Sequence, residues 1–282
     1  MYHKRCAVAE GGNGFQNWEC AETAKGYSYL YIISSIDCLL LGRDERCYNP
    51  DVTIAYRWSA AAAYHAAQLE SPKRSTVALG KFIRKYLDRE PASVIDVGCG
   101  TGANLHWLRD CFGDARLVGL DINDVFCRDL EGIEFVQQEN CAVSELGTFD
   151  VGLSIQCLSW LDAYERPIQA MFKSCRQWMF ITSLFTDSRV DSINRVTQYD
   201  EDFRADSGSP YFYNVYSIER FRRFCLANGA KEIMAQDFEI DIDIPKPEHG
   251  LMGTYTVRAE DGRRLQISGP LFMPWKMVAV RI

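Results

Sequence analysis

Residues 94–103 read VIDVGCGTGA, and this stretch decides the fold class of the chain. An apolar run with the pattern of a buried strand leads into three glycines, and a helical pattern begins directly after them. Residues without a side chain let the backbone turn tightly and approach a ligand closely, and the exposed amides that open a helix favour an anionic group. The stretch therefore predicts a strand, a ligand-binding loop and a helix, in that order.

A second feature follows the next strand pattern, Arg116–Leu120, which leads into Asp121 nineteen residues after Gly102. A carboxylate at this point can accept both hydrogen bonds of a ribose diol. Ile122 beside it offers an apolar surface for a purine. The glycine loop and the acid together predict a ligand that contains adenosine.

Strand and helix patterns alternate from residue 93 to residue 182. The strand patterns are those of buried strands, at Val94–Val97, Arg116–Leu120, Ile133–Val136, Val151–Ile155 and Trp178–Thr182. The helical patterns between them are Asn104–Cys111, Asn123–Leu130 and Tyr164–Arg176. This alternation predicts an α/β fold with a mostly parallel sheet and helices on both faces.

The two ends of the chain carry other patterns. Residues 1–90 are predicted to form a helical N-terminal cap, with helices at Trp18–Ala24, Tyr27–Leu41, Asp51–Glu70 and Thr76–Asp88. Residues 91–282 form the predicted ligand-binding core. Its last part is a Tyr-rich loop region, Thr186–Tyr216, then a helix, Ser217–Asn228, and strands at Glu232–Ile244, Gly253–Arg258, Arg263–Ser268 and Trp275–Ile282.

The composition argues against several classes of partner. The chain has 282 residues and a net charge of -7, which does not suit a binder of nucleic acid backbones. Its apolar segments are too short for a membrane span, which needs about 20 apolar residues. The eleven cysteines contain no CxxC pair, so no metal site is predicted, and reduced thiols indicate a cytoplasmic protein.

Two classes of ligand fit the glycine pattern. Gly98-x-Gly100-x-x-Ala103 matches the dinucleotide-binding pattern of NAD-type domains. However, the charge of Asp96, two residues before the first glycine, would repel a diphosphate and attract an ammonium group. With Gly102 as the third glycine, the pattern reads GxGxG. Both features resemble motif I of the class I S-adenosylmethionine-dependent methyltransferases.

The resemblance covers about residues 90 to 282. It implies a Rossmann-like, mostly parallel seven-stranded sheet with a terminal antiparallel hairpin, with S-adenosylmethionine as the cofactor and S-adenosylhomocysteine as the product. It also implies that Gly98, Gly100 and Gly102 lie beside the methionine part of the cofactor. Asp96 would reach the amino group of the cofactor indirectly, and Asp121 would bind its ribose.

The same resemblance assigns residues after two further strands. Glu139 or Asn140 occupies the place where the family contacts the adenine amino group. Ser154 and Gln156, at the end of the fourth strand, occupy the place that faces the methyl group. These four residues, with Ile122, complete the expected cofactor-binding set.

The residue that activates the acceptor is less clear from the sequence. Methyl transfer from a sulfonium is an in-line displacement, and a hydroxyl acceptor needs a base. Many relatives carry a His shortly after the fourth strand, where this chain has Trp160. Three catalytic candidates remain: His65 in the helical pattern Asp51–Glu70, His249 in a loop rich in Pro and Gly, and Tyr213 in an aromatic tract.

Short matches outside the glycine loop indicate an acceptor class. The segments 15–21, 25–27, 56–58 and 211–216 resemble bacterial methyltransferases of surface-polysaccharide gene clusters. They favour a small-molecule acceptor, with the hydroxyl of a sugar or natural product as the methylated group. Two alternatives stay open, a scaffold that binds the cofactor without catalysis and an NAD(P)-dependent oxidoreductase.

Overall fold

The computed structural model describes residues 68–122, 130–199, 202–205, 211–247 and 253–282. All of them belong to Arg46–Ile282, one of the two units into which the chain divides. The predicted helices at Trp18–Ala24, Tyr27–Leu41 and Asn123–Leu130 lie outside these ranges, apart from the last residue of the third. The predicted helix Asp51–Glu70 is described only from Gln68 onward, where the backbone is helical.

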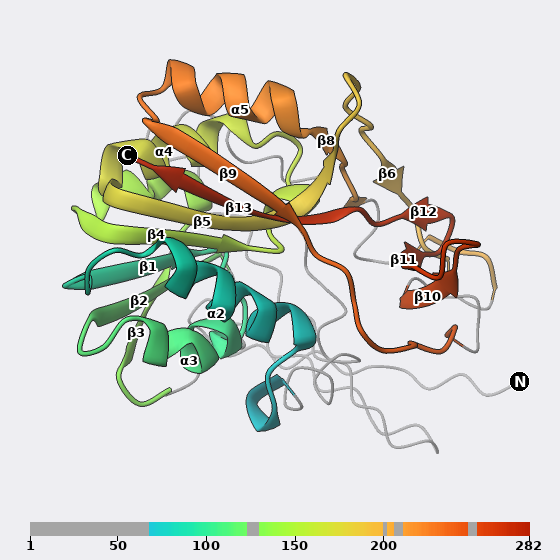
Figure 1. Cartoon of the computed structure of the whole chain (residues 1–282), viewed down its shortest axis with the longest axis horizontal. Coiled ribbons are helices and arrows are strands. Elements are labelled where there is room, and N and C mark those ends of the chain that lie inside the picture. The colour runs from blue at the N-terminus through green and yellow to red at the C-terminus, as the bar shows by residue number, and fades with distance from the viewer. Residues whose placement is uncertain (1–67, 123–129, 200–201, 206–210, 248–252) are drawn as a thin grey trace, which may run out of the picture. The chain divides into compact units, whose positions relative to one another are not determined.

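A central sheet organises the described residues (Figure 1). Its main path has seven strands in the order β3-β2-β1-β4-β5-β13-β9. The parallel strands are β1 (Ser93–Val97), β2 (Arg116–Asp121), β3 (Ile133–Gln137), β4 (Phe149–Ile155) and β5 (Cys175–Thr186). The order reverses between β1 and β4, so the crevice outside their carboxyl ends is the place where an open α/β sheet binds ligands.

Two antiparallel strands close one side of the sheet. Strand β13 (Trp275–Arg281) pairs with β5 and with β9 (Glu232–Asp237), both in antiparallel register. A further short strand, β8 (Tyr216–Ser217), pairs with the end of β5 in parallel. The mostly parallel Rossmann-like sheet and its antiparallel β9–β13 pair are therefore confirmed.

Helices cover both faces of the sheet, as Figure 1 shows. Helices α2 (Arg74–Tyr86) and α3 (Ala103–Leu108) bury an apolar stripe on one face, and the short η3 (Arg109–Cys111) continues α3. Helices α4 (Glu165–Ser174) and α5 (Ile218–Ala227) pack on the other face. Burial on both faces explains why the central strands are continuously apolar in sequence.

The connection between β9 and β13 is long and carries a small sheet of its own. Its strands are β10 (Thr254–Arg258), β11 (Arg264–Ser268) and β12 (Leu271–Phe272), paired in antiparallel fashion. The predicted strand Glu232–Ile244 is too long, because β9 ends at Asp237, the residue that pairs with Lys276 near the start of β13. A strand without a partner loses its ladder of hydrogen bonds.

The described parts of the region Thr186–Tyr216 contain short paired strands, where the sequence predicted a loop region. The two-residue strands β6 (Arg195–Val196) and β7 (Tyr211–Phe212) pair with each other, and Ser192 forms an isolated bridge with Val215. The two ends of the segment therefore pair with each other, between the end of β5 and the start of α5. Its last residues pass the carboxyl end of β5, beside the ligand-binding crevice.

Candidate functional site

The glycine loop after β1 is held in a conformation that only glycine adopts easily. Gly98, Gly100 and Gly102 have φ angles of 80°, 54° and 72°, all in the left-handed region. The amides of Gly98 and Cys99 both donate to the carbonyl oxygen of Leu120, over 2.8 and 3.0 Å. These bonds fasten the loop to the end of β2, and α3 begins directly after Gly102.

Asp121 joins the same loop from the end of β2. The amide of Gly100 donates to the Asp121 Oδ2 over 2.8 Å, across 21 residues of sequence. The neighbouring strands β1 and β2 bring the acid and the glycines together. One carboxylate oxygen of Asp121 therefore orients the loop.

Asp96 lies inside the sheet at the start of the loop, with no exposed surface. Among the described residues, neither of its carboxylate oxygens has a hydrogen-bond partner. Burial raises the pKa of the Asp96 carboxyl from 3.8 to about 7, and the negative charge of Asp121 adds to the rise. A buried carboxylate without a partner is costly, so this position suits a cationic group of a ligand.

Cys157, two residues beyond β4, completes the crevice from the other side of β1. Its Sγ accepts a hydrogen bond from the Asn140 Nδ2 over 3.3 Å, and it packs so closely on Gly98 that a Cβ at that glycine would overlap it. Burial, with the charges of Asp121 and Asp96, raises the pKa of the Cys157 thiol to about 12. The thiol is therefore protonated at neutral pH.

The end of β4 is strained at Gln156, which is not a glycine yet has a φ angle of 55°. Its amide donates to the carbonyl oxygen and the Oγ1 of Thr182, and its Nε2 donates to Ser75 Oγ over 3.4 Å. Ser154, two residues earlier and within β4, is fully buried. Strain of this kind gathers at functional sites, where surrounding contacts hold it.

Two of the predicted cofactor residues lie at the edge of this group. Ile122 is 43% exposed, and its carbonyl oxygen accepts from the Gln137 side chain. Glu139 directly precedes the short helix η4 (Asn140–Glu145) and is partly buried. Contacts therefore join Asp121 to Gly100 and Asn140 to Cys157 beside Gly98, whereas Ile122 and Glu139 lie at the edge of this group.

Solved structures share this architecture. A structure described as a DhpI-SAH complex has a TM-score of 0.52 at 13% identity, over 83% of this chain and 98% of that one. TehB from Haemophilus influenzae (TM-score 0.44, 14% identity, 74% of this chain) and an O-methyltransferase family protein from Burkholderia thailandensis (0.48, 11%, 81%) also match. The chain spans 62% and 61% of the length of these last two. No curated protein sequence matches the chain.

A family model described as a methyltransferase domain matches residues 95–180. The range contains the glycine loop, Asp121 and the end of β4. Residues 95–180 are therefore a methyltransferase domain. Within the described ranges, no helix of this chain is long and apolar enough to cross a membrane.

The sequence prediction of a methyltransferase is thus confirmed at the level of the domain. The contribution of Cys157 was missed, because a cysteine within an apolar run is typical of a core residue. The available signal was its position: Cys157 lies two residues after a strand that ends where the strand order reverses. In the methyltransferase domain, the same edge also holds the glycine loop.

The catalytic candidates fall in different places. His65 and His249 lie outside the described residues. Tyr213 is 9% exposed, and its ring centroid lies 4.4 Å from that of Trp160. Tyr211 joins them, 5.8 Å from Trp160, so the aromatic tract packs against the turn that follows β4 of the methyltransferase domain. We call these three residues the aromatic cluster.

Proposed function

We propose that this chain transfers a methyl group from S-adenosylmethionine to a small-molecule acceptor, at the hydroxyl of a sugar or natural product. The observation that carries the proposal is the buried Asp96 carboxylate without a partner, beside a glycine loop oriented by Asp121. A sulfonium cofactor with an ammonium group supplies the positive charge that this site lacks. When bound, it supplies an electrophilic methyl group.

Different residues of the chain bind different parts of the cofactor. Gly98, Gly100 and Gly102 let the backbone approach the methionine part of the cofactor, and Asp96 attracts its amino group. The second oxygen of Asp121 accepts from the ribose while the first stays with Gly100. These assignments rest on the geometry of the loop together with the family resemblance.

Further residues complete the binding set. Asn140 and Glu139 follow β3 on the side where adenine lies, with Ile122 as an apolar neighbour. Ser154 and Gln156, at the carboxyl end of β4, face the methyl group. The strained backbone of Gln156 supports this role, because the structure keeps it in place through Thr182 and Ser75.

The acceptor would lie beyond the end of β4, next to the aromatic cluster. Alignment of the acceptor and exclusion of water are the main demands of an in-line displacement. Aromatic side chains at this edge suit a ring-shaped acceptor such as a sugar. We propose Tyr213, His65 and His249 as the groups that position the acceptor hydroxyl or take its proton.

Residues 1–90 are proposed to form a helical N-terminal cap. Within the described ranges, Ser75 in α2 contacts Gln156, and Thr76 donates to the Asn104 side chain at the start of α3 over 2.7 Å. We also propose a cytoplasmic location. Burial raises the pKa of the Cys175 and Cys225 thiols to about 12, and such reduced core cysteines suit a reducing compartment.

Calorimetry separates the proposed function from its alternatives. The protein is titrated with S-adenosylhomocysteine and, separately, with NADH, and micromolar binding of the first alone is expected. Binding of NADH alone would overturn the proposal in favour of an oxidoreductase. A second assay then measures release of S-adenosylhomocysteine across a panel of sugars and phenols. Tight cofactor binding with no turnover of any acceptor would support a scaffold instead.

A further inference from the structure

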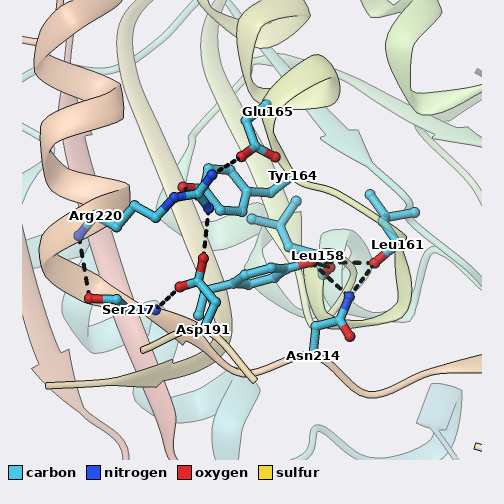
Figure 2. Close-up of polar contacts among 9 residues, drawn as sticks. Leu158, Leu161, Tyr164, Glu165, Asp191, Asn214, Ser217 and Arg220 are labelled. Carbon is cyan, nitrogen blue, oxygen red and sulfur yellow. Dashed lines mark hydrogen bonds and ion pairs between the residues drawn. The ribbon is translucent and has the colours of Figure 1, made fainter. Parts of the chain in front are cut away.

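The turn after β4, η5 (Leu158–Trp160), is held by two buried side chains from the segment that follows β5 (Figure 2). The backbone amide of Asn214 donates to the Ser159 carbonyl oxygen over 2.8 Å. The Nδ2 of the same residue donates to the Leu161 carbonyl oxygen, also over 2.8 Å. Asn214 thus binds two backbone carbonyl groups of this part of the chain, those of Ser159 and Leu161.

Tyr216 holds the turn from a second direction and shares one carbonyl group, that of Leu161, with Asn214. Its hydroxyl lies 3.4 Å from the Leu158 carbonyl oxygen and 3.3 Å from that of Leu161, and it accepts from the Asn214 Nδ2 over 3.0 Å. Asn214 and Tyr216 are 0% and 2% exposed. Their side-chain polar groups bind the turn and each other, so we infer that their effect on chemistry acts through the turn.

The turn connects the two halves of the site. On one side it continues from Cys157, whose carbonyl oxygen accepts from the Trp160 amide over 2.9 Å and whose Sγ packs on Gly98. On the other side, the Trp160 ring packs on Tyr213. A shift of the turn therefore moves the wall of the glycine loop and the aromatic cluster together.

A charged network fixes the backbone next to Asn214 and Tyr216, as Figure 2 shows. The Asp191 Oδ1 accepts from the Ser217 amide over 2.7 Å, and its Oδ2 accepts from the Arg220 Nη1 over 2.8 Å. The Arg220 Nη2 donates to Glu165 over 2.6 Å, and the Nη1 also donates to the Tyr164 hydroxyl. The start of α5 is thus tied to the start of α4.

We propose that Asn214 and Tyr216 are positioning residues for methyl transfer: they fix the turn after β4 and through it place Cys157 and Trp160 at the edge where donor and acceptor meet. The proposal rests on the proposed function for the meaning of that edge. The segment after β5, which carries Tyr211 and Tyr213 of the aromatic cluster, thereby also sets the shape of the donor side. Asn214 and Tyr216 lie 53 to 58 residues from the carbonyl groups they bind.

Tyr216→Phe tests the proposal, because it removes only the hydroxyl. Two readouts are used on the full chain: the rate at which N-ethylmaleimide labels Cys157, followed by peptide mass spectrometry, and the affinity for S-adenosylhomocysteine by calorimetry. In the native arrangement the thiol reacts slowly, since burial and nearby carboxylates disfavour the thiolate. Labelling is expected to accelerate about tenfold, and affinity to fall severalfold.

Tyr164→Phe is the matched control. Tyr164 is 1% exposed and its hydroxyl is bound by Arg220, not by the turn. It is expected to lower the melting temperature to a similar degree while both readouts stay within about twofold of the parent. Asn214→Ser, which keeps the backbone bond to Ser159, serves as a second variant and should act like Tyr216→Phe.

Two results would overturn the positioning role. The first is unchanged labelling of Cys157 in Tyr216→Phe and Asn214→Ser, and the second is equal acceleration in Tyr164→Phe, which indicates general loosening. Failure of the proposed function looks different, because the unmodified protein then binds no S-adenosylhomocysteine or turns over no acceptor. The labelling experiment still tests in that case whether Tyr216 fixes the turn. Once an acceptor is known, kcat should fall more than KM rises.

Discussion

The backbone amide of Gly100 donates a hydrogen bond to the Oδ2 of Asp121, with 2.8 Å between nitrogen and oxygen. This bond links the glycine loop after β1 to the end of the neighbouring strand β2. Asp121 is also the residue to which we assign the ribose of the cofactor, so this proposal gives one side chain two roles, in shaping the loop and in binding the ligand. A substitution of Asp121 consequently affects two interactions at once.

Asp121→Ala is expected to weaken binding of S-adenosylhomocysteine by about 1–3 kcal/mol, because charge-assisted hydrogen bonds to the ribose and the support of Gly100 are lost. Isothermal titration calorimetry at constant pH and salt measures the change. Asp114→Ala, at an exposed acid in the turn before β2, is the matched control and should leave affinity unchanged. Equal affinity of the Asp121 variant and the parent would mean that the ribose assignment is wrong.

Gly98→Ala is expected to lower the free energy of unfolding by about 2–4 kcal/mol. An alanine would be strained in the left-handed backbone conformation of this position, and its Cβ would overlap Cys157. Gly132→Ala separates the two causes. Gly132 has a similar φ angle of 76°, and no described atom lies within 4 Å of its added Cβ. That variant should lose only about 1 kcal/mol in urea unfolding. Similar losses in both variants would show that Cys157 does not press on the loop.

Gly100→Ala is expected to separate binding from stability. The φ angle of Gly100 is 54°, and no described atom lies within 4 Å of its added Cβ, so the folded chain should lose no more than Gly132→Ala does. The methyl group would occupy space that we assign to the cofactor, and affinity for S-adenosylhomocysteine should fall about tenfold or more. Calorimetry on both alanine variants gives the comparison. Affinity equal to that of Gly132→Ala would place the ligand away from Gly100.

The sequence predicted the central strands well because burial on both faces leaves a continuous apolar signal. Strand β1 was expected at Val94–Val97 and is found at Ser93–Val97. Strand β5 was expected at Trp178–Thr182 but extends over Cys175–Thr186, since β13 pairs with it as far as Leu184. Strand ends depend on the partner strand, and a single strand's own residues do not carry that information.

The contacts that complete the site were harder to predict. Gly100 and Asp121 belong to one motif with a typical separation, whereas Cys157 meets Gly98 only because β4 is the neighbour of β1 in the sheet. Asn214 and Tyr216 lie in a segment without a helix or strand pattern. Their side chains bind backbone carbonyl groups in and directly after η5. Every residue type has such a carbonyl group, so the accepting residues give no signal in the sequence.

Asp96→Asn tests the electrostatic basis of the proposed function through pH. The folded chain keeps the Asp96 proton up to about pH 7, while a carboxyl in the unfolded chain releases it near 3.8. Between these values the folded state binds more protons, so the contribution of Asp96 makes the free energy of unfolding fall as pH rises from about 4 to about 7. An asparagine carries no charge, and this part of the pH dependence should vanish in the variant.

The same substitution should therefore raise stability and reduce binding. At pH 8 without ligand, urea unfolding should find Asp96→Asn more stable than the parent by on the order of 2–4 kcal/mol, whereas at pH 4.5 the two should be similar. Affinity for S-adenosylhomocysteine at pH 8 should fall, because its ammonium group loses a buried counter-charge. Parallel stability profiles from pH 4.5 to pH 8 would contradict the raised pKa. A more stable variant with unchanged affinity would support the raised pKa of Asp96 but indicate that another residue binds the cationic group of the ligand.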